Sequence, residues 1–288
     1  MSDFVRQNAV ATDFAGSDSW VILSPIEQSI KRKIESVGVP LKDWDINIYR
    51  GVLTGYNEAF IISTEKRDEI LSNCQTPEER QRTEELIRPI LRGRDIKRYG
   101  YDWSGLWLIN THNGIKGKLE RIHIEDYPAV KAHLDQYWDK ISTRADKGDT
   151  PYNLRNCAYL DDFSKPKIAW ARLMRITKRD VNDFPRFALI PEGIFTVDSL
   201  CFFSGNEIER ICFILNSEYA AYYFLKNIVA LDNGGLQMRQ QYIEEMPLPM
   251  ESDNSDESIY STFGFTDDEI LFIRNYIKSR KEEILERD

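Results

Sequence analysis

The sequence has few of the residues from which cross-linked, metal-binding or membrane-spanning proteins are built. Its 288 residues include four cysteines without a Cys-x-x-Cys pair and three histidines without ligand-like spacing. Disulfide frameworks and zinc sites need denser or more regular ligands, so we expect neither, and no metal site is predicted. No apolar run approaches the roughly 18 residues of a membrane-spanning helix, and the first residues lack the basic and apolar regions of a signal peptide. We therefore expect a cytoplasmic protein.

Acidic residues outnumber basic ones, and the imbalance is concentrated at one end of the chain. The formal net charge is -9. Residues 251–288 contain 11 acidic and 5 basic residues, a net charge of -6, which leaves -3 for residues 1–250. Within that part, residues 88–98 carry five basic residues against one acidic, and residues 165–179 carry six against none. Because electrostatic attraction depends on the local field, these two basic patches permit binding to an anionic partner.

The pattern of apolar residues predicts an α+β fold in which short strands and helices alternate irregularly. Start signals for helices are Ser24-Pro25, Thr76-Pro77 and Thr266-Asp267-Asp268-Glu269. Helices are expected over residues 24–37, 64–88 (one or two), 126–145 and 207–229 and from 266 onward. Strands are expected over residues 46–52, 58–63, 105–110, 167–173 and 193–203, and an acidic linker over 251–258. This mixture favours an irregular mixed sheet with flanking helices and a C-terminal helix, which either packs on the body or binds a partner.

The most distinctive segment is Arg50-Gly51-Val52-Leu53-Thr54-Gly55-Tyr56-Asn57, in which two glycines enclose a polar turn between two expected strands. Glycine allows positive φ or a close approach of two backbones, which a Cβ atom would resist. The simplest interpretation is a β-hairpin whose glycines serve turn geometry. The alternative is a functional site built into the connection between two strands.

This motif resembles the one that opens the TaqI-like C-terminal specificity domain, the target-recognition module of type IIG restriction–modification enzymes and related adenine-specific DNA methyltransferases. Further segments agree in the same order: Ile90-Leu91-Arg92-Gly93-Arg94-Asp95-Ile96-Lys97-Arg98-Tyr99, Leu106-Trp107-Leu108-Ile109, Lys165-Pro166-Lys167-Ile168-Ala169-Trp170, Leu215-Asn216-Ser217 and Met246-Pro247-Leu248-Pro249. The resemblance spans about residues 20–250. It implies sequence-specific binding of double-stranded DNA on behalf of a methyltransferase catalytic domain in the same parent protein.

The resemblance also implies how the chain divides. Residues 1–20 are expected to be a linker or the tail of a catalytic domain, residues 21–250 the DNA target-recognition domain, and residues 251–288 an acidic linker with a C-terminal helix. The parent is expected to be an adenine-N6 methyltransferase that binds S-adenosylmethionine, and relatives of this kind are often fused to an endonuclease. A protein-interaction module that docks a partner subunit through the acidic tail is the alternative.

Catalytic motifs are missing from the chain itself. It contains no Asn/Asp-Pro-Pro-Tyr/Phe tetrapeptide to hold a target adenine and no glycine-rich loop for S-adenosylmethionine or a nucleotide. Three scattered histidines support no Ser-His-Asp or Cys-His arrangement. Asp95-Ile96-Lys97 is half of a nuclease motif whose other carboxylates are not identifiable. We therefore expect no catalytic residue and no cofactor in this chain.

Candidate DNA-binding residues fall into two groups, because cations grip phosphates while Arg, Asn and Gln read base edges. The expected phosphate ligands are Arg92, Arg94, Lys97, Arg98, Lys165, Lys167, Arg172, Arg175, Lys178 and Arg179. The candidates for base reading are Asn57, Tyr152, Asn153, Arg155, Asn233, Gln237, Arg239 and Gln240. Arg50, Gly51, Gly55 and Asn57 are expected to shape a loop, because residues shared by a family that reads many sequences serve better as scaffold. For any one of the lysines and arginines, a solvated edge strand is the alternative.

Overall fold

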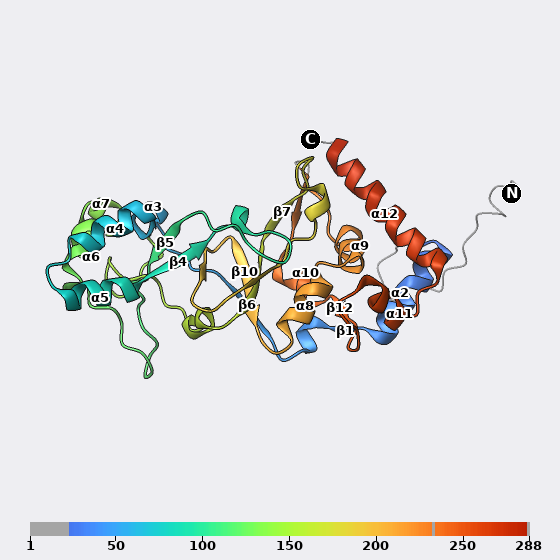
Figure 1. Cartoon of the computed structure of the whole chain (residues 1–288), viewed down its shortest axis with the longest axis horizontal. Helices are drawn as coiled ribbons and strands as arrows, with labels where there is room; N and C mark the ends of the chain where they lie inside the picture. The colour runs from blue at the N-terminus through green and yellow to red at the C-terminus, as the bar shows by residue number, and fades with distance from the viewer. Residues whose placement is uncertain (1–22, 232–233, 287–288) are drawn as a thin grey trace, which may run out of the picture.

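The computed structural model describes residues 23–231 and 234–286, and its fold is α+β, as the sequence predicts. The molecule is elongated, with strands in its middle and helices at both ends (Figure 1). Helices α3 to α7 gather at one end, and α2 with α8 to α12 gather at the other. Among the residues described, no helix is long and apolar enough to cross a membrane.

Many of these elements are short. The helices are α2 (Pro25–Val37), α3 (Asn57–Phe60), α4 (Thr64–Ser72), α5 (Pro77–Leu86), α6 (Pro128–Asp135), α7 (Trp138–Ile141), α8 (Ile208–Leu215), α9 (Glu218–Asn227), α10 (Gln240–Glu244), α11 (Asp256–Phe263) and α12 (Asp267–Glu286). The strands are β1 (Val39–Pro40), β2 (Asn47–Arg50), β3 (Ile61–Ser63), β4 (Ile87–Leu91), β5 (Leu106–Ile109), β6 (Lys167–Ala171), β7 (Leu173–Arg175), β8 (Ala188–Ile190), β9 (Phe195–Thr196), β10 (Leu200–Ser204), β11 (Gly235–Gln237) and β12 (Pro247–Leu248). Turns of 3₁₀ helix are η1 (Leu41–Asp43), η2 (Gly93–Asp95), η3 (Ile124–Asp126), η4 (Leu160–Ser164) and η5 (Val181–Asp183).

The central element is an antiparallel sheet with the strand order β2-β10-β6-β8, and both of its faces are buried. Successive residues of a strand point to opposite faces. Trp170 and Phe203 accordingly pack into one apolar core, whereas Ala169 and Phe202 pack into another. This double burial explains why the segments of β6 and β10 are nearly continuous apolar runs.

The first core lies between this sheet and the helices α2, α8, α9, α11 and α12. It contains buried side chains from α2, α8, α9, α11 and α12, among them Ile30, Ile214, Phe224, Phe263 and Ile273. Two small sheets border it, one formed by β1 and β12 and one by β7 and β11. Because α11 and α12 share this core with residues before position 250, the acidic tail packs on the body.

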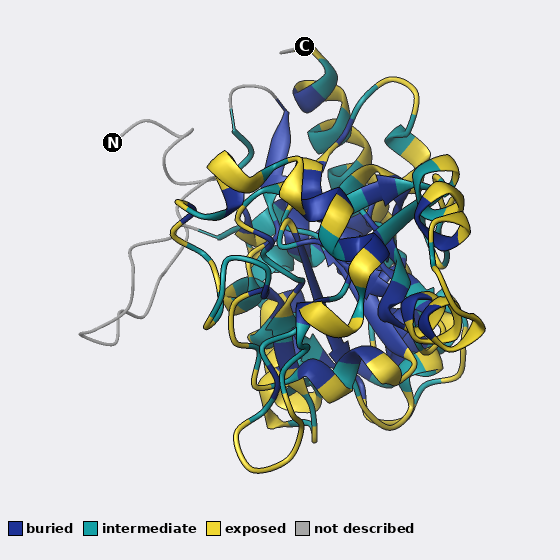
Figure 2. Ribbon diagram, turned by 90° about the vertical axis from the view of Figure 1, so that its left-hand side faces the viewer, coloured by how far each residue is buried: buried dark blue, intermediate teal, exposed yellow. Residues whose placement is uncertain are grey.

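The second core lies on the other face of the central sheet. A four-stranded sheet with the order β3-β5-β4-β9 covers it, and helices α3 to α7 close it from outside. Viewed from that end of the molecule, buried segments lie inside and exposed residues line the outer helices and loops (Figure 2). Phe60, Ile90, Leu108, Leu134 and Phe163 are fully buried there.

Helix starts follow the capping residues in the sequence. Ser24 and Glu27 form a capping box at α2, and Thr266 and Glu269 form another at α12, with Thr266 N–H donating to the carboxylate at 2.8 Å. Thr76 accepts a hydrogen bond from Glu79 N–H at the start of α5. The predictions for residues 24–37, for one or two helices over 64–88 and for the last helix are therefore confirmed, and the second segment forms two helices.

Several sequence predictions are wrong. The segment 50–62 is no hairpin, since β2 belongs to the central sheet and β3 to the four-stranded sheet of the second core. Ala59 and Phe60, expected in a strand, form helix α3. The helices expected over 126–145 and 207–229 and the strand expected over 193–203 are each broken in two, and α11 begins inside the expected linker. The turn between α8 and α9 is buried and is stabilised by contacts distant in sequence, the hydrogen bonds between Asn216 and Phe187.

Candidate nucleic-acid interface

Gly51 lies where the motif crosses the connection between β9 and β10. Its N–H donates to the carbonyl of Leu200 at 3.0 Å, and Val52 N–H donates to the carbonyl of Thr196 at 2.7 Å. A Cβ atom at position 51 would lie 2.1 Å from the carbonyl oxygen of Val197. Glycine is therefore required here because two backbones approach each other, and the crossing carries the chain from one sheet to the other.

Gly55 lies in a turn that a buried arginine holds in place. Its φ is +70°, which favours glycine, and a side chain there would collide with the backbone of Asp146. Arg144 donates hydrogen bonds to the carbonyls of Thr54, Asp146 (2.7 Å), Pro151 (3.2 Å) and Asn153 (2.6 Å). Burial lowers the pKa of this guanidinium to about 10. Sequence analysis missed Arg144, because its partners come from separate turns that only the fold brings together.

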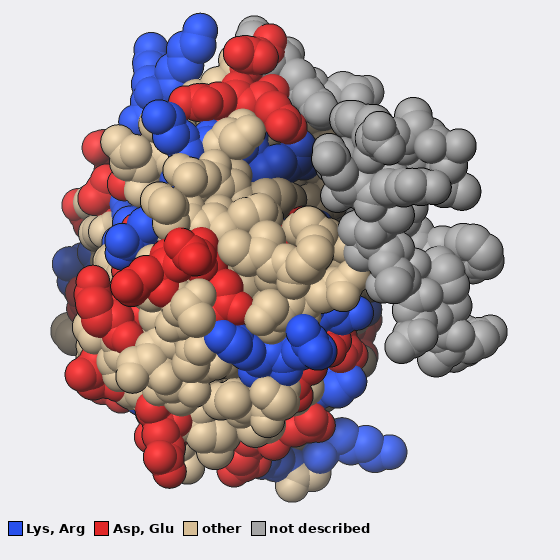
Figure 3. All heavy atoms as spheres, turned by 90° about the vertical axis from the view of Figure 1, so that its right-hand side faces the viewer, with Lys and Arg blue, Asp and Glu red and all other residues tan. Residues whose placement is uncertain are grey.

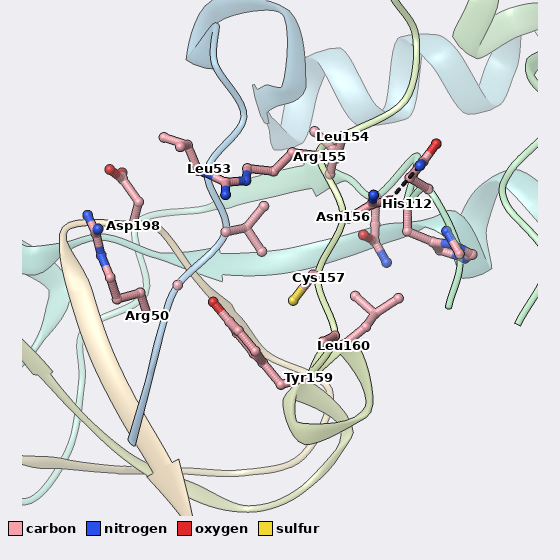
Figure 4. Close-up of a pocket in the computed structure, with 16 residues that line it drawn as sticks. Arg50, Leu53, His112, Leu154, Arg155, Asn156, Cys157, Tyr159, Leu160 and Asp198 are labelled. Carbon is pink, nitrogen blue, oxygen red and sulfur yellow. Dashed lines mark hydrogen bonds between the residues drawn. The ribbon is translucent and has the colours of Figure 1, made fainter. Parts of the chain in front are cut away.

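A pocket of about 350 Å³ opens beside the motif. Residues 50–53 form one wall, and residues 154–160 form another. Figure 4 shows Arg50 and Asp198 at one end, His112 and Asn156 at the other, and Tyr159 between them. The structure thus brings the motif together with Arg155, which the sequence placed in a separate turn. Asp198 and Tyr159 were not identified from the sequence.

Burial favours the neutral form of two ionisable groups in this pocket. Burial raises the pKa of the Cys157 thiol to about 11, so the thiol is not activated. Burial also lowers the pKa of His112, which favours the neutral imidazole. The ring of Tyr159 stacks on that of Tyr49 with centroids 4.4 Å apart. The described residues contain no cluster of three or more His, Cys, Asp or Glu side chains able to hold a metal ion.

Four chain segments that carry arginines come together near the ends of β6 and β2. The amide of Arg172 donates to the carbonyl of Ser199 at 3.0 Å, which places it at the β9–β10 connection that Gly51 crosses. Burial raises the pKa of the Cys201 thiol to about 11, and the nearby charges of Arg172 and Arg50 act in the opposite direction. We call the six arginines on these segments the arginine surface: Arg50, Arg92, Arg94, Arg172, Arg175 and Arg239.

Two further contacts connect the remaining members of the arginine surface. A Cβ atom at Gly93 would lie 3.5 Å from that of Ala171, so the η2 turn with Arg92 and Arg94 packs beside the end of β6. Strand β7, which ends at Arg175, pairs with β11, which Arg239 follows. Arg50, Arg94, Arg175 and Arg239 are exposed, whereas Arg92 and Arg172 are half-buried. Arg92 also donates to Ser104 and faces the buried carboxylate of Asp95, which orients its guanidinium.

Two predicted DNA ligands are buried, and their assignment is corrected. Lys167 is fully buried, and its ammonium donates to the carbonyls of Phe163 (3.0 Å) and Ile194 (3.3 Å). Asn153 is 1% exposed, and its amide donates to the carbonyl of Ile122 at 2.9 Å. Neither side chain can reach DNA while these contacts are made. The central sheet is covered on both faces, so alternation in β6 cannot expose a lysine.

Some of the other predicted residues have partners within the chain, and the rest are at least partly exposed. Lys165 precedes β6 at the end opposite Arg172 and pairs with Asp162 at 2.7 Å. Arg98 donates to the carbonyl of Asn216, the C-cap of α8, at 2.7 Å. Exposed or half-buried positions are occupied by Asn57, Lys97, Tyr152, Arg155, Lys178, Arg179, Gln237 and Gln240. The amide oxygen of Asn57 accepts a hydrogen bond from the Thr54 hydroxyl at 2.5 Å, which fits a loop-shaping role. Asn233 and residues 1–20 lie outside the described residues.

Comparison with known proteins identifies the fold. The model of the TaqI-like C-terminal specificity domain matches residues 88–248. The chain belongs to this family. The resemblance seen in the sequence is therefore confirmed, although the matched residues of the specificity domain begin after the Gly51–Gly55 motif.

Relatives of this specificity domain are larger proteins. A curated relative, the type II methyltransferase M.BstVI of Geobacillus stearothermophilus, is 24% identical in an alignment of 245 residues that covers 82% of this chain and 39% of that protein. The structure of the type IIG restriction endonuclease BpuSI aligns with a TM-score of 0.54 and 14% identity over 91% of this chain and 33% of its own. The type IIL restriction-modification enzyme MmeI, solved in complex with DNA, aligns with a TM-score of 0.54 and 10% identity over 85% of this chain and 37% of its own. The chain thus spans between a third and two fifths of these relatives.

Proposed function

We propose that this specificity domain recognises a DNA target sequence on behalf of an adenine-N6 methyltransferase. The catalytic domain and its S-adenosylmethionine site would belong to the part of the relatives that this chain does not span. In that arrangement the chain holds the duplex while the catalytic domain flips and methylates the base. An endonuclease in the same parent protein would use the same recognition. This chain would contribute binding and no catalytic residue.

The arginine surface is the observation that carries this proposal beyond family membership. The six arginines are Arg50 of β2, Arg92 and Arg94 at the η2 turn, Arg172 between β6 and β7, Arg175 at the end of β7, and Arg239 in the segment after β11. The segments that carry them contact one another. Cations placed on phosphates fix the register of a protein on the duplex. They also release counterions, so for each phosphate contact the logarithm of the binding constant falls by about 0.9 when the salt concentration rises tenfold. A local surface of this kind can bind DNA although the chain is acidic in total, because screening limits distant charges to a range of about 10 Å.

A protein-interaction module is the second candidate, and the charge at the α2–α12 end of the molecule favours it. Acidic and basic side chains are interspersed on that face (Figure 3), a pattern suited to a protein partner and unsuited to a phosphate backbone. Leu271 on α12 is 58% exposed there. Helices α11 and α12 pack into the first core, so neither is free to dock as a separate helix on a partner protein. DNA recognition therefore remains the better-supported function.

The test is selection of the full chain on a pool of random DNA duplexes at low salt, followed by binding measurements across a salt series. We expect one short motif to be enriched. Arg94→Ala and Arg172→Ala should each reduce the salt slope by about one unit and weaken all sequences alike. Arg32→Ala, an exposed arginine on α2, should leave the slope unchanged. If the folded chain retains no duplex at any salt concentration, the proposal is wrong and protein interaction becomes the better account.

A further inference from the structure

Strands β7 and β11 form a two-stranded antiparallel ribbon at the edge of the first core. Their direct pairs are Leu173 with Gln237, Met174 with Leu236, and Arg175 with Gly235. Directly opposite residues of an antiparallel pair project to the same face, and neighbours along a strand project to opposite faces. The ribbon therefore has one face formed by Met174 and Leu236 and another formed by Leu173, Gln237, Arg175 and Gly235.

The inner face of the ribbon is anchored in the first core. Met174 and Leu236 are at most 1% exposed. Beyond β11, the carbonyl of Met238 accepts a hydrogen bond from the indole of Trp170 at 2.9 Å, which joins the ribbon to the central sheet. Helix α12 braces the other end, where Ile284 is buried against Gly234. The inner face of the ribbon and both of its ends are thus held by contacts with the rest of the fold.

The outer face carries three side chains of different chemistry. Leu173 is 43% exposed, Arg175 is exposed and Gln237 is half-buried. The guanidinium of Arg186 donates to the backbone carbonyl of Arg175 at 2.6 Å, which fixes the backbone while the side chain of Arg175 points outward. Gly235, opposite Arg175, adds no side chain that would shield the arginine. An apolar group, a bidentate cation and an amide therefore lie side by side on one face.

These three side chains match the edges of bases in the major groove of DNA. Arginine pairs with the two acceptors of guanine, glutamine with the donor and acceptor of adenine, and an apolar side chain contacts the methyl group of thymine. The major groove, about 12 Å wide, admits a two-stranded ribbon whose strands lie about 5 Å apart. The central sheet cannot serve in this way, because both of its faces are buried.

Resting on the proposed function, we infer that the β7–β11 ribbon enters the major groove and reads bases through Arg175, Gln237 and Leu173. Arg172 and Arg239 lie at the end of the ribbon that adjoins β6, Arg94 lies on the η2 turn that packs beside Ala171, and these arginines would hold phosphates next to the groove. Arg175, which the sequence assigned to phosphate binding, is reassigned to base reading by its position on the outer face. Arg155 is a weaker candidate for base reading, because it pairs with Asp146 at 3.3 Å beside the pocket.

The experiment repeats the duplex selection with the full chain carrying Arg175→Lys, Arg175→Ala or Gln237→Ala, and with Arg94→Ala as the matched control. Arg175→Lys keeps the charge but loses the bidentate fork. We expect both Arg175 variants to relax one base position by on the order of 10- to 100-fold, and Gln237→Ala to relax a different position. Arg94→Ala should weaken binding to every sequence without altering the motif. Unchanged thermal unfolding of each variant shows that the fold is retained, since all of these side chains point outward.

The outcomes separate this inference from the proposed function. If the unaltered chain selects a motif and the ribbon variants select the same motif with uniformly weaker binding, the ribbon contacts phosphates and the inference is overturned while DNA recognition stands. If Arg175→Lys retains the original motif that Arg175→Ala loses, a single cation at position 175 reads the base, and the bidentate contact is refuted while base reading stands. If the unaltered chain retains no duplex, the proposed function fails and this inference fails with it.

Discussion

At the scale of single residues, the ammonium group of Lys167 depends on backbone carbonyls alone. Its three acceptors belong to Phe163, Pro191 and Ile194, at 3.0, 3.5 and 3.3 Å. Burial lowers the pKa of Lys167 to about 8, although Asp162 and Glu192 act in the opposite direction. The unfolded chain has a lysine of ordinary pKa, near 10.5. Between these two values the unfolded state binds more protons than the folded state.

This difference predicts a pH-dependent stability that a single substitution removes. Since the folded pKa is the lower one, the contribution of Lys167 to the free energy of unfolding rises with pH through about 8 to 10.5, by up to about 3 kcal/mol. Buried thiols such as Cys212 act in the opposite direction, because burial raises their pKa values. The measurement is therefore the free energy of unfolding in urea of the chain and of Lys167→Met, compared at pH 7.5 and at pH 10. Lys178→Met, at an exposed position, is the control, and equal pH slopes for the chain and Lys167→Met would contradict the prediction.

Residue types could be predicted from the sequence more readily than their surroundings. The need for glycine at positions 51 and 55 follows from the motif, and the backbone crossing and the positive φ agree with it. The sequence predicts Lys167 as a phosphate ligand, with a solvated edge strand as the alternative. Its true environment depends on the η4 turn and on the residues after β8, which lie over its strand only in the folded chain. Local sequence contains no information on such covering segments.

At the scale of elements, helix α12 has one side buried in the first core and another side exposed to solvent. Ile273 is fully buried in the first core, whereas Leu271 two residues earlier is 58% exposed. Glu269 in the first turn accepts hydrogen bonds from Ser29 (2.7 Å) and Lys33 (2.6 Å) of α2. The first turn of α12 is thereby attached to α2, the first helix of the described chain.

Packing of α12 predicts a sharp contrast between these two neighbours. Ile273→Ala removes a buried side chain and leaves a cavity, so we expect a loss of about 2 to 4 kcal/mol in the free energy of unfolding. Leu271→Ala should change it by no more than about 0.5 kcal/mol. Chemical unfolding followed by circular dichroism measures both. Equal effects would mean that α12 does not pack as described.

The starts of helices could be predicted because capping is local, whereas strand pairing could not. The Ser24, Thr76 and Thr266 caps each lie within three residues of their partners. In contrast, β2 pairs with β10, so Arg50 lies opposite Cys201. Pairing over such a distance depends on which apolar faces meet, and the strand signals alone do not determine that. This is also why the Gly51 segment was interpreted as a hairpin and why the ribbon of β7 and β11 was not foreseen.

At the scale of the whole molecule, the two apolar cores share the central sheet. Alternate residues of β6 and β10 belong to different cores, so neither core can lose its packing while the other stays intact. We therefore expect the described part of the chain to unfold in one cooperative transition, with equal calorimetric and van't Hoff enthalpies.

Substitutions in the two cores test this coupling. Ile214→Ala in the first core and Leu134→Ala in the second should both lower the midpoint of the same single transition. Scanning calorimetry measures it, and the two variants control for each other because each affects one core. Two separate transitions, each shifted by only one of the substitutions, would show that the cores unfold independently.

The division of labour within the ribbon has an evolutionary consequence. Met174 and Leu236 supply its packing, so Leu173, Arg175 and Gln237 can be exchanged at little cost in stability. Mutations at these outward positions would change what is bound without endangering the fold that presents it. A lineage carrying this scaffold could therefore acquire a new preference in one or two mutational steps, while Trp170 and α12 continue to hold the ribbon in place.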